Sequence, residues 1–308
     1  MKQEYNNKKK FWIMFLILGI LFFFSIIISL IIKSGEPITE YNTAIISING
    51  PITVDENNGW FADSTTSSTT TIELIDKASK DLKVKAIIFE INSPGGSPVA
   101  TDEIAVKIKS LKDKNITTVA WIRETGASGA YWIASSTDHI IANRMSIVGS
   151  IGVFGSYIEW YGLMDIYNVT YKRLVSGEYK DTGVPFRPMT EKEELYIQSK
   201  LDKLHDFFIR AVAENRNMSY AEVKILATGE IFLGSEAVNN GLVDELGSEQ
   251  QVLDYIESQI GEKPITKRFF REKSFFESIM EAINKNSFYM GQGIGDRLFV
   301  NTKMRIMT

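Results

Sequence analysis

The feature that most constrains the fold is an alternation of short apolar runs with segments of helical spacing. Val84–Ile91 is a nearly continuous apolar run, Val99–Leu111 has helical spacing, and Ile116–Ile122 is the next apolar run. Strands that are apolar on both faces are typical of parallel sheets covered by helices. The alternation therefore predicts an α/β fold with a largely parallel sheet flanked by helices.

The same reading continues along the rest of the chain. Further strands are predicted at Ala44–Ile48, Ile140–Ala142, Ile147–Val153 and Val169–Val175. Further helices are predicted around 72–78, after Ser128, at Tyr157–Tyr167, within Gly234–Gly247, at Glu249–Ile260, and behind capping boxes at Thr190–Glu193 and Ser219–Glu222. Thr53–Thr71 is rich in serine and threonine and is either a mobile lid or a plain surface loop.

Two turns follow predicted parallel strands and are expected at the same edge of the sheet, where ligands bind in such folds. One is Asn92–Gly96, and the other is Thr125–Ser128. Ser128 is either a helix cap, since serine is a preferred cap, or a nucleophile held on a tight turn. The N–H groups of Gly95 or Gly96 and of Gly129 can form an oxyanion hole, although Pro-Gly-Gly also occurs in ordinary turns.

Composition limits the chemistry available to Ser128. The chain has no cysteine, which excludes thiol catalysis, disulfide bonds and cysteine-ligated metals. Its two histidines, His139 and His205, lie in a predicted strand and a predicted helix rather than in a turn. Any general base is therefore expected to be a lysine. The formal net charge of -4 gives no reason to expect nucleic acid, and no metal or cofactor is indicated.

Phe11–Ile32 is an apolar run interrupted only by Gly19, Ser25 and Ser29. As a helix it spans roughly 33 Å, enough for a bilayer core. It is longer than the apolar part of a secretory signal, and no cleavage site follows it. We therefore predict an uncleaved transmembrane anchor at 11–32. The lysines before it place residues 1–10 in the cytoplasm and the rest of the chain outside.

Four segments in a fixed order resemble the signal peptide peptidase A (SppA) family, in its short Gram-positive form. They are Asn92–Gly96, Ala127–Gly129 with Tyr131–Ile133, Gly149–Val153, and Ser176–Asp181. The resemblance runs from about Ala44 to Gly247. Gly126 and Ala130 depart from the pattern, but both remain small. The resemblance implies a membrane-bound bacterial serine protease with a Clp/crotonase-like fold built from repeated ββα units.

The resemblance also implies roles for particular residues. Ser128 is the nucleophile and Lys180 the general base of a serine–lysine dyad. Ser150 hydrogen-bonds the lysine, and Gly95 or Gly96 forms the oxyanion hole together with Gly129. Because the two catalytic residues lie in separate elements, we expect Lys180 to reach the serine of a neighbouring subunit in a homo-oligomeric ring.

The lysine must lose its proton to act as a base. Its ordinary pKa of about 10.4 has to fall to about 7–8, which burial in an apolar pocket achieves. Ile151, Val153 and Phe154 are candidates for such a pocket. A carboxylate beside the amine would raise its pKa, so we predict that the Asp181 side chain points away from Lys180 or pairs elsewhere.

The expected substrates are peptides, in particular remnant signal peptides with apolar or small side chains. The predicted organisation is 1–10 cytoplasmic, 11–32 anchor, 33–260 extracytoplasmic protease domain and 261–308 tail. The tail carries an amphipathic stretch that packs on a neighbouring subunit, on lipid or within the domain. Two alternatives are an inactive membrane-tethered ring scaffold of the same fold and a crotonase-like acyl-CoA enzyme.

Overall fold

The computed structural model describes residues 2–34, 40–56 and 65–271. The chain divides into two units, Met1–Tyr41 and Asn42–Thr308, each described by itself below. The first unit contains one helix, α1 (Lys2–Ser34). Within the described residues, no helix combines the length and the apolar character that a membrane span requires. The anchor predicted at Phe11–Ile32 is therefore not confirmed by the structure.

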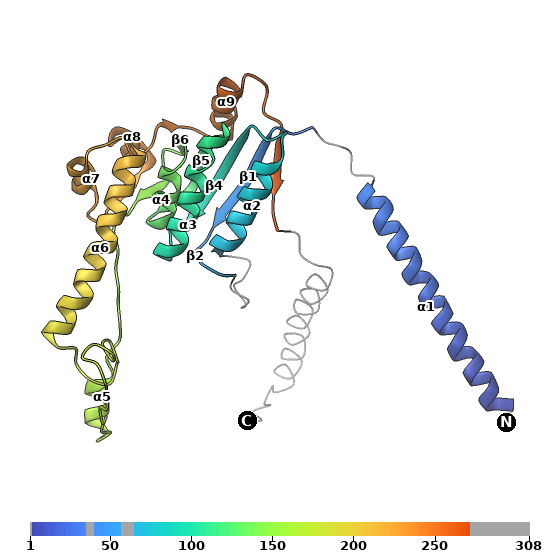
Figure 1. The fold of residues 1–308 in the computed structure, drawn as a ribbon, viewed down its shortest axis with the longest axis horizontal. Coiled ribbons are helices and arrows are strands. Elements are labelled where there is room, and N and C mark those ends of the chain that lie inside the picture. Colours follow the sequence, from blue (N-terminus) through green and yellow to red (C-terminus); the bar gives the residue numbers. More distant parts are fainter. Residues whose placement is uncertain (1, 35–39, 57–64, 272–308) are drawn as a thin grey trace, which may run out of the picture. The chain divides into compact units, whose positions relative to one another are not determined.

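An eight-stranded sheet is the framework of the second unit (Figure 1). Its strands are β1 (Thr43–Asn49), β4 (Ala86–Ser93), β5 (Thr117–Ala127), β6 (His139–Ala142), β7 (Ile147–Gly149), β8 (Ile231–Leu233), β9 (Glu245–Leu246) and β10 (Thr266–Phe269). The order is β10-β1-β4-β5-β6-β9, and every pairing along it is parallel. Strand β7 pairs in parallel with β5 and antiparallel with β8. The prediction of a largely parallel α/β sheet is confirmed.

The helices and a small second sheet complete the unit. The helices are α2 (Ser68–Lys80), α3 (Pro98–Lys109), α4 (Gly129–Ser135), α5 (Tyr161–Ile166), α6 (Glu191–Asn215), α7 (Tyr220–Leu226), α8 (Gly234–Asn239) and α9 (Glu249–Ile260). A 3-10 turn covers Lys112–Lys114. Strands β2 (Ile52–Thr53) and β3 (Thr66–Ser67) form a separate parallel pair. The capping boxes predicted before α6 and α7 are both present.

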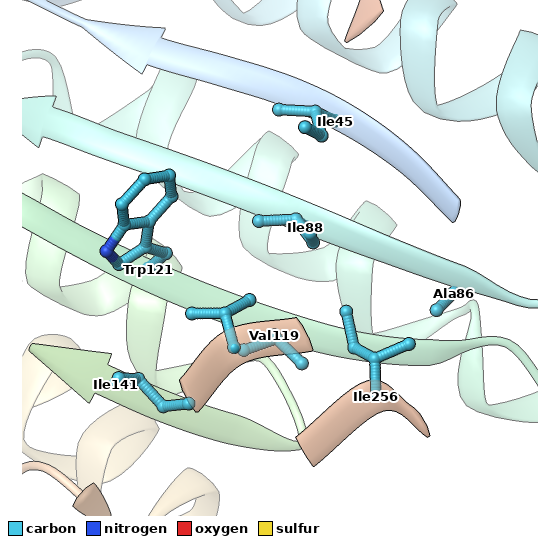
Figure 2. Packing of buried hydrophobic residues seen from close by; sticks show 8 residues of the cluster. Ile45, Ala86, Ile88, Val119, Trp121, Ile141 and Ile256 are labelled. Atoms are coloured by element: carbon cyan, nitrogen blue, oxygen red, sulfur yellow. The ribbon is translucent and has the colours of Figure 1, made fainter. Parts of the chain in front are cut away.

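Helices cover both faces of the sheet, as the apolar strands require. On one face Val252 and Ile256 of α9 pack against Ile88, Val119 and other side chains of the central strands (Figure 2). Because side chains alternate along a strand, the neighbouring residues of β4 face the other way, toward α4. Each isoleucine buried in this core contributes about 1.5–3 kcal/mol.

Several segments differ from the prediction. Strand β3 and the start of α2 lie within the predicted loop Thr53–Thr71, and strands β8 and β9 were not predicted. Val169–Val175 was expected to be a strand but has no strand structure, and Leu174 within it is 97% exposed. A β-rich sequence forms a strand only where it finds a strand partner, and within residues 40–56 and 65–271 this segment pairs with none. Strand β10, which was not predicted, pairs with β1 and adds residues 266–269 to the sheet beyond the expected domain end at 260. The rest of the tail, residues 272–308, lies outside the described residues, as do residues 57–64 of the predicted loop.

Candidate active site

Ser128 occupies a strained turn between β5 and α4. Its backbone has φ 53° and ψ −128°, an arrangement that non-glycine residues rarely adopt and that is concentrated at functional sites. Three hydrogen bonds hold it: the Ser128 N–H donates to the Gly149 carbonyl at 2.8 Å, and the Ser128 carbonyl accepts from Tyr131 at 2.9 Å and Trp132 at 3.1 Å. Although Ser128 stands at the N-cap position, its side chain makes no capping hydrogen bond. The interpretation of Ser128 as a simple cap is therefore wrong.

The glycine turn after β4 packs directly on this serine turn. Gly95 has φ +95°, and a Cβ added to it would lie 2.7 Å from the Gly129 nitrogen and 2.8 Å from the Ser128 Cβ. Only a glycine allows both the backbone angle and the close approach. The Gly95 N–H donates to the Ser93 hydroxyl at 3.1 Å, so it is already used within the turn.

The N–H of the next residue, Gly96, is left available. Ile52 of β2 bridges to Gly96, donating its N–H to the Gly95 carbonyl at 3.0 Å and accepting from Ser97 at 2.8 Å. This pattern leaves the N–H of Gly96 outside the ladder. Across the 40–56 and 65–271 segments, no acceptor for it is found. The Gly96 nitrogen lies 3.4 Å from where a Gly129 Cβ would stand, so the two residues are neighbours in space.

Gly129 is the first residue of α4, and its N–H has no acceptor inside the helix. A Cβ on Gly129 would collide with the Thr101 hydroxyl of α3. Thr101 is fully buried, and its hydroxyl has no hydrogen-bond partner among the described residues. Sequence reasoning missed Thr101, because a threonine on a buried helix face carries no distinguishing signal.

Ser150 lies beside the same turn. It follows Gly149, the residue that accepts the Ser128 N–H, and its own N–H donates to the Glu230 carbonyl at 2.8 Å. Its φ of 51° is a second strained angle next to the serine turn. The structure thus brings together Ser128, the two glycine segments and Ser150, with the N–H groups of Gly96 and Gly129, unpaired among the described residues, on neighbouring residues. Such a set of donors suits stabilisation of a developing oxyanion.

Lys180 is not brought to Ser128 within the chain. It lies on the loop between α5 and α6, is exposed, and makes no side-chain hydrogen bond or ion pair with any described residue. Figure 1 shows this segment extending away from the sheet. The loop is tied to Glu193 at the start of α6, whereas Phe208 of α6 stacks on Trp132 of α4 with ring centroids 5.1 Å apart. Phe208 lies fifteen positions after Glu193, which corresponds to roughly 22 Å of helix.

The apolar pocket predicted for Lys180 is also not formed within one chain. Ile151 is buried in the domain, but the Phe154 side chain is 88% exposed. The surrounding segment, here called the arm (residues 154–197), exposes many large apolar side chains. They include Ile158, Trp160, Ile166, Tyr167, Leu174 and Leu195.

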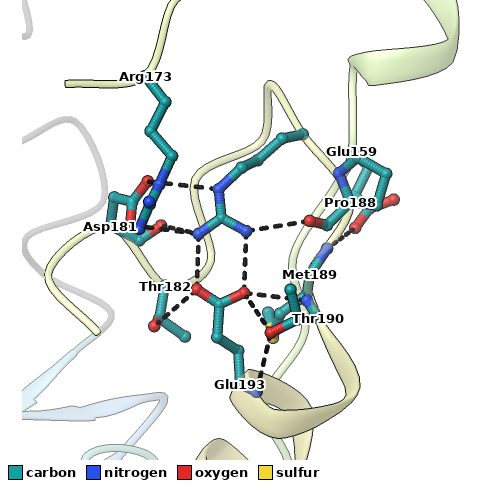
Figure 3. Close-up of polar contacts among 9 residues, drawn as sticks. Glu159, Arg173, Asp181, Thr182, Pro188, Met189, Thr190 and Glu193 are labelled. Carbon is teal, nitrogen blue, oxygen red and sulfur yellow. Dashed lines mark hydrogen bonds and ion pairs between the residues drawn. The ribbon is translucent and has the colours of Figure 1, made fainter. Parts of the chain in front are cut away.

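The prediction for Asp181 is confirmed. Its carboxylate pairs with Arg173, at 2.7 Å and 2.8 Å, and with Arg187, at 3.2 Å (Figure 3). Hydrogen bonds from Arg173 and then Arg187 hold the pKa of the Asp181 carboxyl far below its ordinary value. The sequence predicted Glu193 as the glutamate of a capping box. It did not predict that Glu193 also accepts a hydrogen bond from Arg187.

Among the described residues, neither histidine forms a hydrogen bond with Ser128. His139 begins β6 and pairs in register with Val119 of β5, nine residues before Ser128. At the rise of a strand this is about 30 Å away. His139 stacks on Tyr255 with ring centroids 3.9 Å apart, and His205 lies within α6. Both observations agree with the expectation that the base is not histidine.

The family model and three of the relatives that match this chain are named as peptidases or proteases. The family model "Peptidase family S49" matches residues 110–262. "Putative protease MJ0651" of Methanocaldococcus jannaschii is 35% identical over 73% of this chain and 70% of its own length. "Putative signal peptide peptidase SppA" of Enterococcus faecium is 34% identical, over 70% of this chain and 62% of its own length. "Protease 4" of Haemophilus influenzae is 30% identical, but the match spans only 35% of that longer protein.

Among solved structures, a membrane-bound stomatin-specific protease mutant in complex with a substrate peptide is similar to this chain. The TM-score is 0.46 and the identity 14%, over 80% of this chain and 100% of the other.

Proposed function

The chain belongs to peptidase family S49 and is a serine-type peptidase, and we propose that Ser128 and Lys180 together carry its hydrolysis of peptide bonds. The observation that carries this proposal is the strained Ser128 turn with the N–H groups of Gly96 and Gly129 beside it. In the proposed site, Gly95 supplies the positive φ that lets the glycine turn approach the serine turn closely. Gly96 and Gly129 are the oxyanion donors.

The proposed reaction follows the usual course of acyl transfer. The neutral amine of Lys180 takes the proton of the Ser128 hydroxyl, and the serine oxygen attacks the carbonyl carbon of the peptide. The oxyanion that forms accepts hydrogen bonds from Gly96 and Gly129. Lys180 then gives its proton to the leaving amine, and water hydrolyses the acyl-enzyme by the same steps. Each oxyanion donor typically contributes ~2.7–4 kcal/mol to lowering the barrier. Ser150 is proposed to hydrogen-bond the lysine.

We further propose that the lysine comes from a neighbouring subunit of a homo-oligomeric ring. Two observations support this arrangement: Lys180 is exposed and remote from the serine turn of its own chain, and the arm that carries it presents large apolar side chains. Exposed apolar surface of this extent is typical of protein contacts. Packing of the arm on a neighbour would also supply the apolar surroundings that lower the pKa of a lysine.

The substrate, the cellular location and the fold family follow from the same assignment. We propose remnant signal peptides as substrates, in line with the name of the Enterococcus relative. The apolar run Phe11–Ile32 supports a single-pass anchor in a bacterial cell membrane, with the catalytic domain on the extracytoplasmic side. Resistance of the full chain to extraction from membranes by alkaline carbonate tests the anchor. The parallel sheet with Ser128 at the end of a central strand supports a Clp/crotonase-like fold.

Hydrolysis of a fluorogenic apolar peptide by the full chain tests the function. Ser128→Ala and Lys180→Ala are expected to lose activity, whereas Lys172→Ala, a control on the same arm, is expected to retain it. A fluorophosphonate probe is expected to label the wild type and not Ser128→Ala. A wild type that neither cleaves the peptide nor takes the label would refute the proposal and favour an inactive scaffold.

A further inference from the structure

The loop that carries Lys180 is fixed at the next residue along the chain. Asp181 accepts two hydrogen bonds from Arg173, at Nε–Oδ2 2.7 Å and Nη2–Oδ1 2.8 Å, in a fork geometry. Arg187 approaches the same carboxylate, with Nε 3.3 Å from Oδ2. The Asp181 side chain is only 15% exposed. Its direction is therefore set, and with it the direction of the adjacent Lys180 backbone.

A second fork ties this group to α6. Arg187 donates to Glu193 at Nη2–Oε1 2.6 Å and Nη1–Oε2 2.9 Å (Figure 3). Glu193 is 6% exposed on its side chain and also accepts from Thr190 at the N-cap of α6. Arg173, Asp181, Arg187 and Glu193, here called the clamp, therefore alternate in charge and sum to zero. Paired forks of this kind are the strongest and most directional ion pairs in proteins.

We propose that the clamp positions Lys180 and prevents the Asp181 carboxylate from holding a proton on the lysine amine. This inference rests on the proposed role of Lys180 as the general base. An uncompensated carboxylate close to an amine typically raises the pKa of the amine by about one to three. Such an increase would keep Lys180 protonated at neutral pH. With two guanidinium groups on it, Asp181 can stay beside the base without opposing it.

The two residues before Lys180 also contact α6. Glu178, two residues earlier, pairs with Lys192 of α6 at 2.6 Å. Tyr179 stacks on Tyr196 of α6, with ring centroids 4.6 Å apart. On the serine side of the proposed site, two charged residues are nearest. Glu124 is the charged residue closest to Ser128 in the sequence, and Glu230 accepts the Ser150 N–H through its backbone carbonyl. Among the charges on its own loop and on α6, Asp181 is thus the carboxylate directly adjacent to the base.

The test is the pH profile of kcat/KM for peptide hydrolysis by the full chain, whose acid limb reports the pKa of the base. Arg173→Gln leaves Asp181 less compensated, so the limb is expected to move to higher pH by about one. Activity at neutral pH then falls about tenfold and recovers toward the wild-type plateau at high pH. Asp181→Asn is expected to move the limb to lower pH, and Arg173→Lys, which keeps the charge, to leave it close to that of the wild type. Arg210→Gln, which breaks the exposed pair of Arg210 with Asp206 on α6, is the control and should not move it.

Opposite shifts for Arg173→Gln and Asp181→Asn support the proposal, because a merely structural role would lower the whole profile without moving the limb. Shifts in the same direction, or an unmoved limb in active variants, overturn it. If Arg173→Gln is too unstable to assay, the shift expected for Asp181→Asn alone decides. Lys180→Ala separates the two proposals. Activity retained in that variant refutes the assignment of the base, whereas activity lost in it together with unmoved limbs refutes only the clamp.

Discussion

Replacing Gly95 with alanine tests whether the glycine turn has to touch the serine turn. At φ +95° an alanine costs about 1–3 kcal/mol in backbone strain. Its Cβ would lie 2.7 Å from the Gly129 nitrogen, 2.8 Å from the Ser128 Cβ and 2.9 Å from the Ala127 carbonyl oxygen. Ordinary van der Waals contact begins at 3.4 Å, so the two turns must separate by 3.4 − 2.7 = 0.7 Å. A donor displaced by this much no longer fits the oxyanion.

The expected result is a loss of kcat of about 10²–10³, the effect of removing one oxyanion donor. Gly261→Ala is the matched control, because Gly261 has φ +73° at the end of α9 and nothing within 4 Å of the added Cβ. It is expected to lose stability through the strain alone and to keep its activity. The measurements are kcat and KM on a fluorogenic peptide together with the denaturant midpoint of each variant. A folded Gly95→Ala protein with kcat within about threefold of the wild type would refute the argument.

Three further changes have defined outcomes. Gly129→Ala is expected to abolish peptide hydrolysis, and adding Thr101→Ala to restore part of it, because the new Cβ would lie 3.4 Å from the Cβ of residue 101 once the hydroxyl is gone; no recovery would contradict the predicted clash. Burial would raise the pKa of Glu90, but hydrogen bonds from its two arginine partners outweigh burial and hold that pKa below the ordinary 4.5, so Glu90 stabilises the fold above this pH and the stabilisation is lost as pH falls below it. Denaturant melts between about pH 5 and pH 3 should therefore show a steeper loss for the wild type than for Glu90→Gln, and equal slopes would contradict the assignment. Tyr131→Phe removes the hydrogen bond to the Leu242 carbonyl at 2.9 Å and should lower the free energy of unfolding by about 1–3 kcal/mol, as measured by denaturant titration, whereas an unchanged value would show that the bond contributes nothing.

The local parts of the fold could be predicted from the sequence, and the distant parts could not. The apolar run of β4, the capping box at Thr190 and the turn at Ser128 carry their signals within a few residues. Strand β10 has no such signal, because its partner β1 lies more than two hundred residues earlier. The predicted strand at Val169–Val175 failed for the complementary reason, since its apolar residues belong to the exposed arm.

The candidate site was also predicted in part. The glycine turn and the serine turn were both predicted at one edge of the sheet, and the structure places them in contact. The choice of Gly96 over Gly95 as a donor depends on which N–H the Ser93 hydroxyl occupies, and no sequence pattern indicates this. The clamp around Asp181 joins residues up to twenty positions apart through side-chain geometry alone, so only its existence, and not its members, could be anticipated.

Mixing Ser128→Ala with Lys180→Ala tests most directly whether the site is shared between subunits. Neither variant alone should cleave the peptide. In co-assembled rings formed from equal amounts, about a quarter of the interfaces join an intact serine to an intact lysine, so about a quarter of the wild-type activity is expected. Copurification through a tag on one variant shows that mixed rings have formed, and the Ser128→Ala/Lys180→Ala double variant replaces one partner as the control. Mixed rings that remain as inactive as either variant alone would contradict a lysine supplied by the neighbouring chain.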